Sequence, residues 1–154
     1  ASRDVGSGRL LAEHVRNADV ARAERYGMTK WLFIAFGSAL GGVARYGLQG
    51  WVQRWSDDPF PVGTLVVNVA GCFLIGLLNA ALTGPFLVRE EYRLALTVGL
   101  LGGFTTFSAF GWETLALAND AQWARAILNV CLSIGFGLSA AWLGYRLAVR
   151  WFGV

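Results

Sequence analysis

Four long apolar runs constrain this chain more than any other feature of its sequence. They cover about residues 31–53, 62–84, 93–117 and 123–147. Each is at least as long as the roughly 20 residues that a helix needs to cross a hydrocarbon core about 30 Å thick. In a chain of 154 residues, the remaining residues are too few to shield four such helices from water. The sequence therefore predicts an all-α, multi-pass membrane protein with four transmembrane helices.

Composition and aromatic placement lead to the same prediction. Only 15% of the residues are charged, against about 25% in a typical soluble domain. Five tryptophans fall near the ends of the predicted spans, where aromatic side chains meet the membrane interface: Trp31, Trp51, Trp55, Trp123 and Trp151. No run of Lys or Arg indicates a nucleic-acid partner. We find no nucleophile–base pair and no Cys/His metal cluster, so we expect that the protein is not an enzyme. Its apolar composition indicates that its environment is a lipid bilayer.

Residues 1–27 form a polar N-terminal extension that lacks the apolar segment of a signal peptide. Met28, with Thr29, Lys30 and Trp31 after it, is typical of the start of a membrane protein. Two domains are therefore predicted: the extension, native or added to the natural chain, and a membrane domain over residues 28–154. From Met28 onward, five Lys and Arg residues lie on the side of the termini, against two or three on the other side. This mild bias favours both termini inside.

Two polar side chains in the first two spans are unusual, and each has two explanations. Arg45 either snorkels to the far interface or lines a water-filled vestibule and attracts anions. Asn68 either makes an interhelical hydrogen bond or offers its amide N–H groups to a crossing anion. The first span also carries Gly37 and Gly41, whose spacing predicts close packing against another helix.

The stretch GGFTTFSAFGWE, residues 102–113, is the most specific feature. Gly102 and Gly103 are poor in a helix interior, and Thr105 and Thr106 are weak helix formers. We therefore expect the third helix to break near Gly102–Thr106. Such a break frees backbone carbonyls, which membrane proteins tolerate only inside protein or around a cavity or ion. Carbonyl oxygens alone would suit a hard cation such as Na⁺.

Aromatic and hydroxyl side chains follow the glycines at regular spacing. Phe104, Phe107 and Phe110 stand three residues apart, which would place them on one helical face. They are either a packing stripe or a set of rings whose positive edges attract an anion. Thr106, Ser108 and Glu113 add polar groups to the same half-helix. Glu113 is either part of this site or a mark of the end of the span.

With these residues in hand, the chain resembles the Fluc (CrcB-type) fluoride channel family. Three motifs carry the resemblance from residue 28 onward: GGVARYGL at 41–48, P-x-G-T-L-x-V-N-x-x-G at 61–71 and G-G-F-T-T-F-S at 102–108 with Glu113 after it. In the fourth span, Ser133 and the sequence AWLG at 141–144 also fit. The resemblance implies passive export of cytoplasmic fluoride across the bacterial inner (plasma) membrane, which confers fluoride resistance.

The resemblance also implies an assembly and a set of site residues. The assembly is an antiparallel, dual-topology homodimer with two pores and one structural Na⁺ at its centre. The carbonyls of Gly102 and Thr105 would hold the Na⁺. The fluoride pathway would include eight residues: Arg45 in the vestibule, Asn68, Phe107 and Phe110 along the pore, Ser108 and Glu113 with Thr106 on a polar track, and Ser133 on the fourth helix.

Three positions depart from the family pattern. Ala109 and Gly111 replace hydroxyl residues, and Asn129 stands where Tyr is expected. These changes affect the polar track.

A proton-coupled multidrug exporter is disfavoured because the first span has no acidic residue. A non-transporting scaffold is disfavoured by the broken, hydroxyl-rich third span. If the extension is native, its five arginines strengthen the charge bias, and a heterodimer with an oppositely oriented homologous subunit then stays an alternative to the homodimer.

Overall fold

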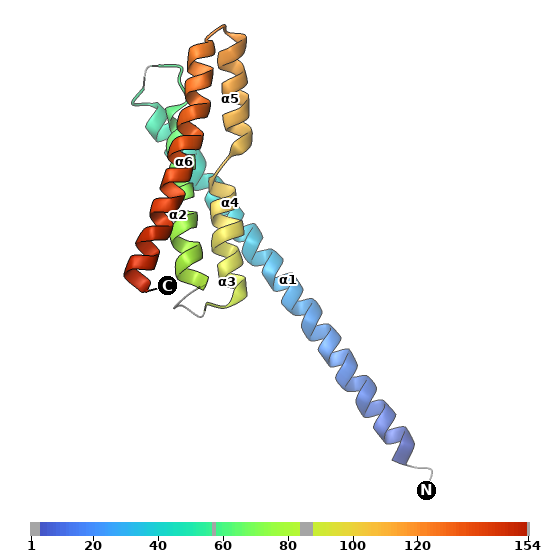
Figure 1. Ribbon diagram of the computed structural model, residues 1–154. Coiled ribbons are helices and arrows are strands. Elements are labelled where there is room, and N and C mark those ends of the chain that lie inside the picture. Colours follow the sequence, from blue (N-terminus) through green and yellow to red (C-terminus); the bar gives the residue numbers. More distant parts are fainter. Residues whose placement is uncertain (1–3, 57, 84–87, 154) are drawn as a thin grey trace. The chain divides into compact units, whose positions relative to one another are not determined.

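The structure, a computed structural model, describes residues 4–56, 58–83 and 88–153. Its regular elements are all helical (Figure 1). In chain order they are α1 (Asp4–Gln53), α2 (Val62–Thr83), α3 (Glu90–Leu94), the π-helical η1 (Ala95–Leu100), α4 (Leu101–Phe104), α5 (Phe107–Asn119) and α6 (Trp123–Phe152). The predicted all-α fold is confirmed. The start of the extension at residues 1–3 and the predicted end of the second span at residue 84 lie outside the described residues.

Four stretches of the described chain are long and apolar enough to cross a membrane. They are Gly27–Gln53, Val62–Leu82, Glu90–Asn119 and Trp123–Phe152. These ranges confirm the four predicted spans, apart from a few residues at their ends. The third span is not one uniform helix, because it consists of α3, η1, α4 and α5 in succession.

The chain divides into two units, Ala1–Leu32 and Phe33–Val154, and the functional site lies in the second. Within that unit α2 and α6 run side by side, as Figure 1 shows. Glycines make this approach possible. A Cβ atom on Gly76 would collide with the Ala141 carbonyl oxygen, and one on Gly144 would collide with that of Phe73. Small residues of this kind allow helices to approach closely in lipid.

Glycines also bring the later part of α1 against the third span. A Cβ on Gly37 would meet the Ala95 carbonyl oxygen, and one on Gly41 would meet that of Leu100. The predicted role of Gly37 and Gly41 in close packing is therefore confirmed. This packing places the second half of α1 beside the residues that precede the helix break.

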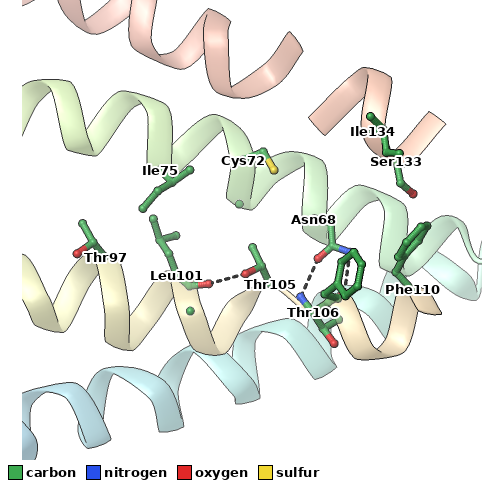
Figure 2. Close-up of a pocket in the computed structure, with 13 residues that line it drawn as sticks. Asn68, Cys72, Ile75, Thr97, Leu101, Thr105, Thr106, Phe110, Ser133 and Ile134 are labelled. Carbon is green, nitrogen blue, oxygen red and sulfur yellow. Dashed lines mark hydrogen bonds between the residues drawn. The ribbon is translucent and has the colours of Figure 1, made fainter. Parts of the chain in front are cut away.

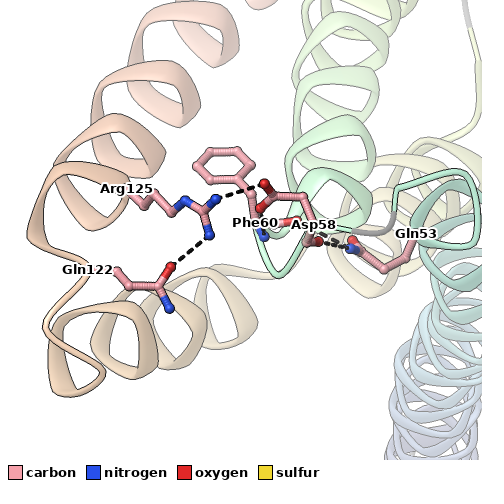
Figure 3. Close-up of polar contacts among 5 residues, drawn as sticks. All are labelled: Gln53, Asp58, Phe60, Gln122 and Arg125. Atoms are coloured by element: carbon pink, nitrogen blue, oxygen red, sulfur yellow. Dashed lines mark hydrogen bonds and ion pairs between the residues drawn. The ribbon is translucent and has the colours of Figure 1, made fainter.

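A side-chain clasp closes the loop between α1 and α2 (Figure 3). The Gln53 amide nitrogen donates to the backbone oxygens of Asp58, at 3.3 Å, and Phe60, at 3.2 Å. Its oxygen accepts the backbone N–H of Gly63 at 3.1 Å, which supplies a partner for one of the unpaired donors in the first turn of α2. Arg125 of α6 reaches the same loop through an ion pair with Asp58 at 2.8 Å.

The turn between α5 and α6 is tight. Ala121 has a φ of 58°, in the left-handed region that residues other than glycine rarely occupy. The next residue, Gln122, donates its N–H to the Leu117 carbonyl at 2.8 Å. This turn reverses the chain, so that α6 can pack on α5 and α2.

Candidate functional site

The third span breaks at Thr105 and Thr106. α4 ends at Phe104, α5 begins at Phe107, and the two residues between them have extended backbone, with φ/ψ of −81°/155° and −147°/110°. Asn68 of α2 holds both backbone groups of Thr106 (Figure 2). The Thr106 N–H donates to Oδ1 at 2.8 Å, and Nδ2 donates to the Thr106 carbonyl at 3.0 Å. The predicted break is therefore confirmed, and Asn68 forms the interhelical contact that was one of its two predicted roles.

Two carbonyls lose their helical donors at this break. In a continuous helix the Gly102 carbonyl would accept from the Thr106 N–H, which here donates to Asn68. The Thr105 carbonyl would accept from the Ala109 N–H, which instead donates to the Thr106 hydroxyl at 3.2 Å. Within the described ranges no other backbone N–H reaches either oxygen. These are the two carbonyls that the resemblance implies for Na⁺.

Arg45 lies at the same break. Its Nε donates to the Gly103 carbonyl at 3.1 Å, and the side chain is half-buried. The guanidinium therefore sits at the carboxyl end of α4, where exposed carbonyls favour a positive charge. Neither of the two predicted roles, snorkelling or lining a vestibule, included this backbone contact.

The two phenylalanines of α5 face each other in a tilted pair. The ring centroids of Phe107 and Phe110 are 5.4 Å apart, with an angle of 49° between the ring planes. Phe107 is 83% exposed in the protomer, whereas Phe110 is half-buried. The prediction that Phe104 shares one helical face with them is wrong, because the break separates Phe104 on α4 from α5.

A cavity of about 450 Å³ lies along the break, between α2, the third span and α6 (Figure 2). Seven of the ten predicted site residues line it: Asn68, Gly102, Thr105, Thr106, Phe107, Phe110 and Ser133. The rest of the lining is mainly apolar, with Cys72, Ile75, Leu101 and Ile134 among its residues. Ser108, Arg45 and Glu113 lie outside this lining, although the Ser108 hydroxyl is 3.2 Å from that of Thr106.

Glu113 belongs to a polar cluster inside the span. Its Oε1 accepts from the Thr64 hydroxyl at 2.6 Å and from the Gln49 amide at 3.4 Å. Gln49 also donates to Thr64 at 2.9 Å. Oε2 is buried and has no hydrogen-bond partner among the described residues. Since α5 continues to Asn119, Glu113 does not mark the end of the span.

Sequence reasoning missed Gln49 and Thr64 as part of this site. The signal was present in their spacing. Gln49 follows Arg45 by four residues, and Thr64 precedes Asn68 by four, so each shares a helical face with a residue already singled out. The described residues contain no group of three or more His, Cys, Asp or Glu side chains that could hold a metal.

The three departures from the family pattern have different surroundings. Gly111 is exposed, and Ala109 contributes its backbone N–H to the cap of α5. Asn129 is 2% exposed, and its amide donates to the Thr114 hydroxyl at 2.8 Å. That hydroxyl in turn donates to the Phe110 carbonyl at 2.7 Å.

Comparison with known proteins identifies the family. Residues 32–145 match the model of the family described as CrcB-like protein, Camphor Resistance (CrcB). The chain is 48% identical to the fluoride-specific ion channel FluC of Geobacter sulfurreducens over 121 residues, which cover 79% of this chain and 98% of the relative. The protein of the same name from Thermus thermophilus is 48% identical over 122 residues, or 79% and 94% of the two chains. That from Methylocella silvestris is 46% identical over 121 residues, or 77% and 92%. The chain therefore belongs to the CrcB-like family.

Proposed function

We propose that this protein is a fluoride-selective ion channel that exports cytoplasmic fluoride passively across the bacterial plasma membrane and so confers fluoride resistance. The observation that carries the proposal is the cavity within the membrane-spanning helices, which is lined by Asn68 and by the ring pair of Phe107 and Phe110. The names of the relatives support it, because proteins 46–48% identical to this chain are called fluoride-specific ion channels. They also support the expectation that the protein is not an enzyme.

Asn68 supplies an oriented donor to the pathway. The Thr106 N–H fixes the amide oxygen, and the Thr106 carbonyl takes one of the two amide hydrogens. The second N–H has no partner among the described residues, so it can donate to an anion. The orientation of the amide is forced, since a flipped amide would place its nitrogen against the Thr106 N–H.

The rest of the pathway offers weak donors in place of bulk water. The edge of a phenyl ring is positive, so Phe107 and Phe110 can attract fluoride without strong binding. Ser108 and Ser133 add hydroxyl donors, and Thr106 lies between the amide and Ser108. A channel must replace the hydration shell of its ion and still release the ion. A set of weak donors meets both requirements.

Two charged groups shape the field around this path. Arg45 is held at the break and raises the local concentration of anions. Glu113 would oppose entry of an anion. Its Oε1 is covered by Thr64 and Gln49, which donate hydrogen bonds to it. We infer that these hydrogen bonds hold the carboxyl group of Glu113 to one side of the fluoride pathway.

The carbonyls of Gly102 and Thr105 fit a structural Na⁺. Both have lost their helical donors, and Gly102 is exposed, with open space where a Cβ atom would lie. Two oxygens are too few for a hard cation, which takes about six. A second copy that brings its own pair would complete more of the shell. The antiparallel homodimer with two pores and a central Na⁺ is therefore part of the proposal, and the exposed Phe107 agrees with a pathway closed by that copy.

Ion release from liposomes tests the channel function. The purified protein is reconstituted in vesicles loaded with KF or KCl, valinomycin is added, and an ion-selective electrode follows fluoride or chloride. We expect fast fluoride release and negligible chloride release. Equal release of both ions, or release of neither, would overturn the proposal.

A single-chain fusion tests the assembly separately. Two copies are joined through a linker with one added membrane span, so that they insert in opposite orientations. Fluoride release by this fusion supports the homodimer. Activity that appears only after a homologous second protein is added would establish the heterodimer instead.

A further inference from the structure

We propose that Asn129 is a positioning residue for the fluoride pathway and that it acts through Thr114 to set the orientation of Phe107 and Phe110. This inference rests on the proposed channel function. Asn129 is almost completely buried in α6, and its Nδ2 lies 2.8 Å from the Thr114 hydroxyl of α5. It occupies a position where the family resemblance implies Tyr. In this chain an amide group is therefore present where a phenol is expected.

The hydrogen bonds run in one direction. A threonine hydroxyl has a single hydrogen, and Thr114 donates it to the Phe110 carbonyl at 2.7 Å. Asn129 must therefore be the donor to Thr114. The chain of donors runs from the Asn129 N–H to the Thr114 hydroxyl and ends on the backbone of a pore phenylalanine.

α5 needs such an anchor because the break uncouples it from α4. Two extended residues join the two helices, and they do not transmit the rotation of one helix to the other. Asn68 and Thr64 of α2 hold α5 at Thr106 and Glu113. Gln49 of α1 adds a longer hydrogen bond to Glu113, at 3.4 Å, and none of these contacts involves α6.

Asn129 supplies the anchor on the other side. Thr114 follows Glu113, and adjacent helical residues point about 100° apart. α5 is thus held by α2 through Glu113 and by α6 through Thr114. Two anchors in different directions fix rotation about the helix axis, and that rotation decides where the rings of Phe107 and Phe110 point.

Four variants test the proposal in liposomes with few channels per vesicle. Asn129→Leu and Thr114→Val keep the shape but remove the hydrogen bond, whereas Thr114→Ser retains it. The fourth variant combines Asn129→Leu with Thr114→Val. The control is a separate variant, Asn119→Leu, at the exposed end of α5. The final fraction of fluoride released counts vesicles that hold a working channel. The rate of release reports conduction by each channel.

We expect Asn129→Leu and Thr114→Val to slow release roughly three- to tenfold, as the loss of one buried hydrogen bond would, with an unchanged final fraction. The double variant should be about as slow as the slower single variant, because both changes break the same connection. Thr114→Ser and Asn119→Leu should keep the wild-type rate.

Three results would overturn the inference while the wild type still releases fluoride. They are unchanged rates in both single variants, additive slowing in the double variant, and a smaller final fraction at an unchanged rate, which would indicate a purely structural role. A wild-type protein that releases no fluoride would overturn the proposed function itself.

Discussion

Asn68 of α2 and Thr106 of the third span exchange two hydrogen bonds, at 2.8 and 3.0 Å. A side chain from another helix thus replaces the helical partners of Thr106. The same exchange releases the Gly102 carbonyl and leaves one N–H of Asn68, a residue that lines the cavity, without a partner among the described residues. One contact therefore shapes both proposed ion sites, the fluoride pathway and the cation site.

Replacement of Asn68 by alanine should damage conduction and stability together. The variant leaves two backbone groups of Thr106 without partners, at a cost of about 1–3 kcal/mol for each buried group. We expect fluoride release to fall at least tenfold and the thermal midpoint in detergent to drop. Asn119→Ala, at the exposed end of α5, should change neither. A variant with wild-type release would remove Asn68 from the pathway.

The ring pair should be needed for conduction and not for folding. Phe107→Ile and Phe110→Ile keep apolar volume but remove the positive ring edges, so we expect fluoride release from liposomes to be lost in both. Phe136→Ile is the control, since Phe136 is an exposed residue of α6. Size-exclusion profiles should stay unchanged in all three. Unchanged release in both ring variants would contradict the roles proposed for Phe107 and Phe110.

The sequence was sufficient to predict the spans and the break because both depend on local composition. Span length follows from runs of apolar residues. The break follows from weak helix formers at Gly102, Gly103, Thr105 and Thr106. The error at Phe104 has the same origin, since a three-residue spacing was applied across a helix that the break divides.

Contacts between distant residues could not be predicted in this way. Arg45 bonds to Gly103, 58 residues away, and Thr64 bonds to Glu113, 49 residues away. Which side chains meet depends on how closely the helices approach, and that distance is set by glycines that no local pattern assigns to a partner.

Close packing of α1 on the third span predicts opposite effects at two adjacent glycines. A Cβ on Gly41 would collide with the backbone at Leu100 and Phe104, whereas one on Gly42 meets nothing within 4 Å. Gly41→Ala should therefore destabilise the protein by about 1–3 kcal/mol. Gly42→Ala should be neutral or slightly stabilising, because alanine favours a helix by up to about 1 kcal/mol. Thermal unfolding in detergent measures both, and equal effects would contradict the packing.

The hydrogen bonds of Gln53 in the loop between α1 and α2 should contribute more to the stability of the protein than the ion pair beside them. Gln53→Leu removes three hydrogen bonds to backbone groups of the loop and α2, so we expect a loss of about 1–3 kcal/mol. Arg125 and Asp58 are 41% and 47% exposed, and such a pair contributes only about 0–1 kcal/mol. Arg125→Gln should therefore have a small effect that shrinks further in high salt. A larger effect for Arg125→Gln than for Gln53→Leu would contradict this ranking.

The turn at Ala121 predicts a stabilising substitution outside the ion pathway. Its φ of 58° is unfavourable for a residue with a Cβ atom, by roughly 1–2 kcal/mol, and carries no such cost for glycine. Glycine also gains freedom in the unfolded chain, which offsets part of the benefit. We expect Ala121→Gly to raise the stability by up to about 1 kcal/mol. Ala118→Gly is the matched control, because Ala118 lies inside α5, where glycine should destabilise by about 1 kcal/mol. A lower thermal midpoint for Ala121→Gly would contradict the strain at this turn, and fluoride release should be unchanged because the turn lies outside the cavity lining.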